Sequence, residues 1–70
     1  MTINNLFDIC ANINNNTGVS VYNSLADFEN ATPYFETFSN KRSMPAYIRN
    51  KKISRFEISK HSNTVFIALE

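Results

Sequence analysis

Cysteine, histidine and glycine are nearly absent from this 70-residue sequence, which has one of each. The lone Cys10 has no intramolecular disulfide partner, although small secreted domains usually need such cross-links. One Cys and one His are too few for a zinc site, and one Gly is too few for a phosphate-binding loop. We therefore expect no metal and no cofactor.

Long apolar runs are also missing. No segment approaches the roughly 20 apolar residues that a membrane span requires. No N-terminal stretch combines a basic flank with a long apolar run, as a signal peptide does. These features, together with the single cysteine, predict a cytoplasmic protein.

Catalytic groups are scarce as well. Cys10 falls on an apolar stripe and His61 falls in a Ser- and Asn-rich loop, so the two residues do not suggest a catalytic pair. The spacing of the six acidic residues does not select two of them for acid–base chemistry. We expect a binding protein and not an enzyme.

What the chain does have is enough apolar residues for one core. Hydrophobic residues make up 43% of the sequence, with six Phe and three Tyr. A chain of this length folds as one domain and buries about 60% of its unfolded surface. Residues 1–70 are therefore expected to form a single small domain.

An amphipathic helix is predicted at the N-terminus. Thr2 is a suitable N-cap, and the residues that follow it at helical spacing form one apolar stripe: Ile3, Leu6, Phe7, Cys10 and Ile13. The segment 14–18 favours a turn that ends this helix. Further along, Ser24-Leu25-Ala26-Asp27 has the spacing of a capping box, which indicates one helical turn.

Four strands are predicted from alternating, β-branched or aromatic segments: 19–22, 34–38, 53–59 and 64–69. Residues 60–63 join the last two strands as a hairpin loop. Pro45 suits the first turn of a helix, so residues 44–50 form either a short helix or a turn. The expected fold is α+β, with the first helix on one face of a four-stranded, mostly antiparallel sheet.

Alternation along the strands separates two sheet faces. One face, beneath the first helix, carries Val19, Val21, Phe56, Ile58, Val65, Ile67 and Leu69. The other carries Tyr22, Arg55, Glu57, Thr64, Phe66 and Ala68, and it is more apolar than a solvated face usually is. We expect this second face to meet a partner, a second copy of the chain in a homodimer, or residues 44–48 folded back over it.

Charge is unevenly divided along the chain. Residues 1–40 carry four acids and no base, whereas all seven Lys and Arg lie between Lys41 and Lys60. This basic segment, expected to mark one edge of the sheet, predicts contact with a partner through Arg42, Tyr47, Arg49, Lys51, Lys52, Arg55 and Phe66. The partner is a protein whose carboxylates the Arg residues grip, or a nucleic acid or nucleotide; the alternative role is a solvated rim. The low net charge of +1 favours a protein.

The chain resembles small accessory proteins of phages and mobile elements in its length, its Asn-rich and Gly-poor composition, and its order of elements. Several such proteins inhibit host defence, anti-CRISPR proteins among them, and they commonly block a surface of a host protein. The resemblance concerns the style of the whole chain and no motif. It implies an inhibitor that acts in the host cytoplasm by protein–protein contact.

Overall fold

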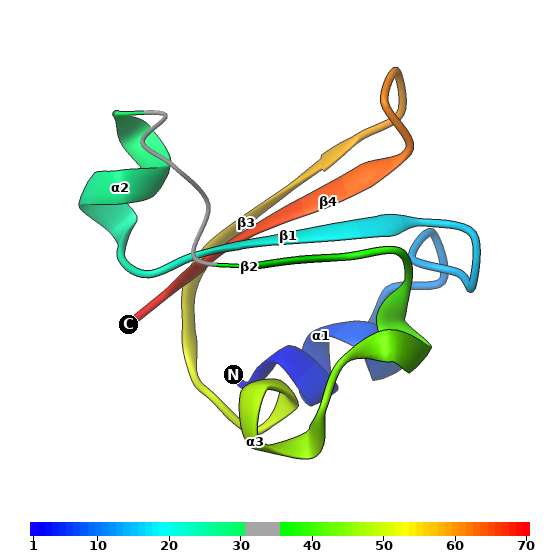
Figure 1. Ribbon diagram of the computed structural model, residues 1–70, viewed down its shortest axis with the longest axis horizontal. Coiled ribbons are helices and arrows are strands. Elements are labelled where there is room, and N and C mark those ends of the chain that lie inside the picture. Colours follow the sequence, from blue (N-terminus) through cyan, green and yellow to red (C-terminus); the bar gives the residue numbers. More distant parts are fainter. Residues whose placement is uncertain (31–35) are drawn as a thin grey trace.

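The computed structural model describes residues 1–30 and 36–70, and it shows an α+β fold (Figure 1). The described helices are α1 (Ile3–Ile9), α2 (Leu25–Glu29), α3 (Ala46–Arg49) and the 3₁₀ turn η1 (Lys41–Ser43). The described strands are β1 (Gly18–Tyr22), β2 (Glu36–Phe38), β3 (Ile53–Ser59) and β4 (Thr64–Leu69). The predicted strand at 34–38 is confirmed over its last three residues, and its first two lie outside the described residues.

The four strands form one mixed sheet in the order β2-β1-β4-β3. β1 pairs antiparallel with β2, β4 pairs antiparallel with β3, and the central pair of β1 and β4 is parallel. The predicted α+β class and four-stranded, mostly antiparallel sheet are therefore confirmed. β3 and β4 form the predicted hairpin, and Asn63 adopts a positive φ of 51°, which Asn tolerates better than most residues.

The core lies between the sheet and the layer formed by α1 and α3 (Figure 1). Its fully buried side chains include Ile3 and Leu6 from α1, Ile48 from α3, and Ile67 from β4. The pairing register confirms both predicted sheet faces, since Val19 pairs with Val65 and Tyr22 pairs with Ala68. The alternation of side chains in a strand is therefore sufficient to assign the buried face.

Helix α1 is shorter than its apolar stripe. It ends at Ile9, and Cys10 is an extended C-cap that is only half-buried. Ile13 is buried, but it reaches the core from the turn that follows the helix. Ala11 and Asn12 form that turn, and Asn favours turns because its side chain competes for backbone hydrogen bonds.

The segment at 44–50 contains a short helix, but one of the three alternatives for the second sheet face, that residues 44–48 fold back over it, is wrong. Met44 and Ile48 are buried in the same core as the apolar side of α1. One polar contact from η1, just before this segment, and one from its last residue hold this part of the chain on the α1 side of the sheet. Lys41 Nζ donates to the Ile13 carbonyl at 3.1 Å, and the Asn4 amide donates to Asn50 Oδ1 at 3.2 Å.

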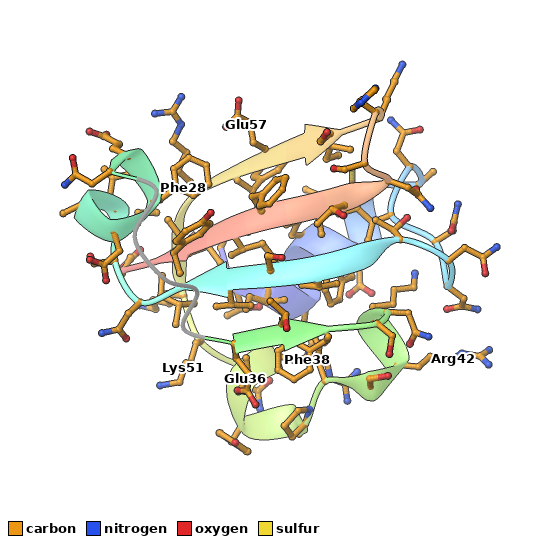
Figure 2. All side chains as sticks on the ribbon, turned by 45° about the horizontal axis from the view of Figure 1, so that its top comes forward. Phe28, Glu36, Phe38, Arg42, Lys51 and Glu57 are labelled. Carbon is orange, nitrogen blue, oxygen red and sulfur yellow. The ribbon has the colours of Figure 1, made fainter. Side chains whose placement is uncertain are left out.

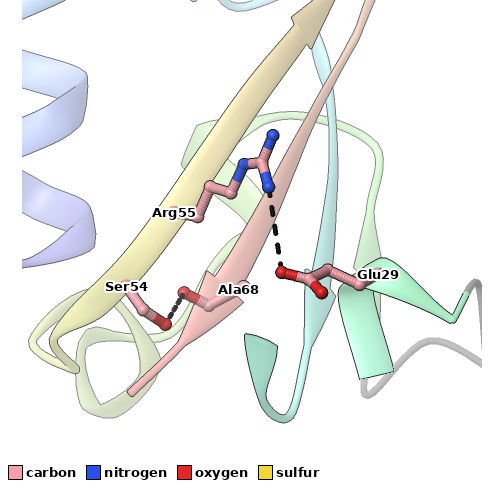
Figure 3. Close-up of polar contacts among 4 residues, drawn as sticks. All are labelled: Glu29, Ser54, Arg55 and Ala68. Carbon is pink, nitrogen blue, oxygen red and sulfur yellow. Dashed lines mark hydrogen bonds and ion pairs between the residues drawn. The ribbon is translucent and has the colours of Figure 1, made fainter. Parts of the chain in front are cut away.

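Helix α2 lies on the opposite face of the sheet from α1 (Figure 1). The Phe28 and Tyr22 rings meet edge to face with 5.3 Å between their centroids. The Arg55 guanidinium lies 5.6 Å from the Phe28 centroid, and its Nη1 lies 3.9 Å from Glu29 Oε1 (Figure 3). The second face is therefore partly covered, because Tyr22 and Ala68 are buried there.

The N-cap of α1 provides a first testable prediction. The Thr2 hydroxyl accepts from the Asn5 amide, and the Asn5 side chain accepts from the Thr2 amide. Replacing Thr2 with Ala is expected to lower the free energy of unfolding by about 1 kcal/mol, because one amide of the first turn loses its partner. Urea denaturation measures this change. Thr2→Ser is the matched control and should retain most of the stability; equal losses in the two variants would contradict the capping role.

Candidate functional site: a basic groove between α1, η1 and α3

A groove with a volume of about 370 Å³ lies where α1, the loop after it, η1 and α3 meet. Asn4, Phe7, Asp8, Asn15, Lys41, Arg42 and Arg49 line it. We call these seven residues the basic groove, because three of them are cations and only Asp8 is an acid. The groove is open to solvent and polar along most of its wall, so it suits a charged or hydrogen-bonding ligand better than an apolar one.

The two walls of the groove are held by local structure. Asn4 and Asp8 are four residues apart on α1, so they lie on the same helical face. On the other side, the Asn40 side chain accepts from the backbone amides of residues 42 and 43 and thereby caps η1. This cap presents Lys41 and Arg42 beside the helix. The third cation, Arg49, comes from the last turn of α3, which is anchored in the core.

The three cations of the groove differ in how they are engaged. Lys41 is committed to the fold, since its ammonium group donates to the Ile13 carbonyl. Arg42 is exposed. Arg49 is half-buried, and its Nε is buried with no hydrogen-bond partner among the described residues. A buried donor without an acceptor is costly, so a rotation of the Arg49 side chain that brought Nε to a ligand acceptor would remove this cost.

The acidic side chain of the groove does not neutralise these cations. Within the described residues, Asp8 forms no ion pair with Lys41, Arg42 or Arg49. The groove therefore has an excess of positive charge, with one carboxylate acceptor and two Asn side chains beside it. Asn amides both donate and accept hydrogen bonds. This set of groups can bind a carboxylate or phosphate and can also pair with a polypeptide backbone.

The predicted partner-binding residues do not form one surface. Arg42 and Arg49 line the basic groove, whereas Lys51 and Lys52 line a separate, smaller hollow of about 210 Å³ together with Asn23, Leu69 and Glu70. Figure 2 shows Arg42 and Lys51 on opposite sides of the molecule.

The remaining three predicted residues lie outside both hollows. Tyr47 is 67% exposed on α3 but lines neither of them. Arg55 and Phe66 belong to the opposite sheet face. The structure therefore brings together two of the seven predicted residues in the basic groove and leaves the others elsewhere.

The expectation that the bases mark one edge of the sheet is wrong. Lys41 and Arg42 follow β2, while Arg55 lies in β3, and these two strands are the opposite edges of the sheet. β1 and β4 lie between β2 and β3 and therefore separate Lys41 and Arg42 from Arg55. A segment that is continuous in sequence therefore presents its charges to different sides of the fold.

Sequence reasoning did not choose five of the seven groove residues as parts of the site, although Lys41 begins the predicted basic segment: Asn4, Phe7, Asp8, Asn15 and Lys41. Asn4 and Asp8 were recognisable as the polar side of the first helix. What the sequence did not reveal is that η1 and α3 pack beside that side of the helix.

Other site types have no counterpart in the described part of the chain. Residues 1–30 and 36–70 contain no group of three or more His, Cys, Asp or Glu side chains arranged to hold a metal ion. Among the helices of the same residues, none has the length and apolar character needed to cross a membrane. Comparisons with protein families, curated proteins and solved structures found no match for this chain.

Proposed function

We propose that this protein is a non-enzymatic binding protein whose basic groove receives an acidic segment of a protein partner. The observation that carries this proposal is the convergence of Lys41, Arg42 and Arg49 on one groove, where the buried Arg49 Nε has no acceptor among the described residues. A carboxylate is a fitting ligand, because hydrogen bonds between guanidinium and carboxylate groups are charge-assisted and directional.

The distribution of charge favours a protein over a nucleic acid. A strand of nucleic acid needs a continuous basic track with aromatic side chains on which bases stack. Here Lys51 and Lys52 lie in a separate hollow, and Phe66 lies on the opposite face from the groove. Asp8 repels phosphates and carboxylates alike, so its charge does not decide between the two partners, but it can accept from a peptide N–H.

The resemblance to phage and mobile-element accessory proteins makes a host protein the proposed partner, and blocking of its surface the proposed action. Size is consistent with this role. A standard interface takes about 800 Å² from each partner, which is roughly a fifth of the 4331 Å² that this chain exposes. Binding of this kind would therefore use the groove together with much of the α1–η1–α3 side.

Titration followed by NMR tests the proposal with defined probes. A Glu-rich peptide of about ten residues is added to ¹⁵N-labelled protein, and a Gln-rich peptide of equal length is the control. We expect the Glu-rich peptide to shift the amide resonances around Asp8, Asn15 and Arg42, with smaller changes near Lys51 and Lys60. The Gln-rich peptide should produce weaker shifts, because it lacks the carboxylates.

A deoxythymidine oligonucleotide of about ten nucleotides distinguishes the alternative. If the oligonucleotide binds the groove and the Glu-rich peptide does not, the proposal of a protein partner is wrong. Loss of the oligonucleotide signal between about 50 and about 200 mM salt would then assign the contact to phosphates.

A further inference from the structure

The outer edge of β3 is covered over only part of its length. Residues 1–3 run antiparallel to the start of this strand, with an isolated bridge between Thr2 and Lys52. The Ile3 amide donates to the Lys51 carbonyl at 3.1 Å, and the Ile53 amide donates to the Met1 carbonyl at 2.9 Å. Beyond this point, no described strand pairs with the outer side of β3. Residues 54–59 therefore form the free edge of β3.

The hydrogen-bond pattern shows which backbone groups this edge presents. The Glu70 amide donates to the Lys52 carbonyl, so these two residues face each other across the ladder. Along an antiparallel strand, every second residue directs its backbone N–H and C=O groups at the neighbouring strand. Counting back along the chain from Glu70, the residues of β4 that direct these groups at β3 are therefore 68 and 66. Their partners are Arg55 and Glu57. Phe56 lies between these two residues, and Ile58 follows them. The backbone N–H and C=O groups of both therefore point away from the sheet.

A bulge in β3 determines that the backbone groups of Arg55, and not those of Phe56, face β4. The register shifts between Ile53 and Arg55, which leaves Ser54 as an extra residue. The Ser54 hydroxyl donates to the Leu69 carbonyl at 2.9 Å and reaches the Ala68 carbonyl at 3.5 Å (Figure 3). The strand is regular from Arg55 to the end, and an unprotected regular edge is a template for another strand.

We propose that this edge pairs with the same edge of a second copy of the chain, antiparallel about a two-fold axis through Phe56. In this register Arg55 lies opposite Glu57 of the second copy, and Glu57 lies opposite Arg55. Because the backbone groups of Arg55 and Glu57 face β4, these are non-hydrogen-bonded pairs across the new ladder, in which side chains approach most closely. Oppositely charged cross-strand neighbours stabilise such a pairing.

Neighbouring registers do not have this complementarity. The two-fold axis is perpendicular to the sheet, because the core faces of both copies must lie on the same side of the joined sheet. Such an axis passes between one residue and the same residue of the second copy. An axis through Arg55 places two arginines opposite each other, and an axis through Glu57 places two glutamates opposite each other. Like charges directly opposite are destabilising, so the charges select the register centred on Phe56.

The side chains on both faces are available for this contact. Phe56 is 38% exposed although it lies on the core face, and in the dimer it would meet the Phe56 ring of the second copy. Glu57 is exposed and points away from the strands in Figure 2, with no ion pair to a described residue. Arg55 contacts Glu29 at 3.9 Å, and its guanidinium has further donors for a second carboxylate.

Sedimentation velocity of the full chain tests the proposal. The paired stretch covers only residues 54–58 of each strand, because residue 59 would face Ile53, whose amide already donates to the Met1 carbonyl. We therefore expect a weak dimer with a dissociation constant between about 1 µM and about 1 mM. Glu57→Arg alone and Arg55→Glu alone should each weaken self-association by at least about tenfold, because each places like charges opposite each other twice. An equimolar mixture of the two variants should dimerise again. In the mixed pair, one strand carries only arginine at positions 55 and 57, and it faces a strand that carries only glutamate at both.

Amide hydrogen exchange locates the contact. In the dimer, the Phe56 and Ile58 amides should become protected as concentration rises, while the Arg55 and Glu57 amides, already directed at β4, should change little. Circular dichroism confirms that both variants remain folded. A chain that stays monomeric at about 1 mM, or a dimer in which Phe56 and Ile58 stay unprotected and the mixture does not recover, would overturn the proposal.

Discussion

Replacing Ile67 with Ala is expected to lower the free energy of unfolding by about 2–5 kcal/mol. Ile67 is fully buried in β4, one of the two central strands. Its pairing partners Val21 and Phe56 flank it on the same face, and α1 covers that face, so neighbouring groups have little freedom to fill the cavity. The loss therefore includes both the transfer term and the cavity term.

The size of this loss matters because the protein is small. A chain of 70 residues is typically stable by roughly 3–10 kcal/mol, so the variant should lie near the limit of folding. Thermal denaturation would record a decrease in Tm of roughly 8–40 °C, since each kcal/mol corresponds to about 4–8 °C. Ile9→Ala is the matched control, since Ile9 is 68% exposed and should change stability little. Similar losses for the two variants would contradict the assignment of the core.

Removing Arg42 and Arg49, two groove cations that form no ion pair with a described residue, is expected to abolish detectable binding of the Glu-rich peptide. Each charge-assisted hydrogen bond contributes about 1.5–3 kcal/mol, so losing both corresponds to roughly a hundredfold or more in the dissociation constant. The variant is Arg42→Glu with Arg49→Gln. Glutamine at 49 retains a polar chain in the half-buried position, and Lys41 is left unchanged because it supports the Ile13 carbonyl.

A second double variant controls for net charge. Lys60→Glu with Lys51→Gln changes the charge by the same amount, but neither residue lines the basic groove. We expect it to bind the Glu-rich peptide with nearly wild-type affinity, as measured by the same NMR titration. If the two double variants lose affinity equally, attraction is a property of the whole molecule and the groove is not the site.

Local patterns in the sequence were enough to predict several parts of the fold. The Thr2 cap, the Ser24 cap and the β3–β4 hairpin depend on residues close together in the chain, and all three are confirmed. The two sheet faces were also predicted, because alternation along a strand does not depend on which strand lies next to it.

The candidate site was less predictable, because it depends on packing between distant segments. Arg42 and Arg49 were chosen for their charge, and the structure does bring them together. Their separation from Lys51 and Arg55 follows from the strand order, which places β4 between β1 and β3. Charge along a chain indicates which residues attract a partner, but the topology decides which of them share a surface.

The parallel pairing of β1 with β4 also constrains the order of folding during synthesis. Gly18 pairs with Thr64, and Tyr22 pairs with Ala68, so the centre of the sheet joins segments that a ribosome makes far apart in time. Until Leu69 has been added, β1 lacks this neighbour and the apolar side of α1 lacks much of its cover. Such non-local pairing slows folding, and a nascent chain would keep its N-terminal half exposed to chaperones and proteases until β4 is available.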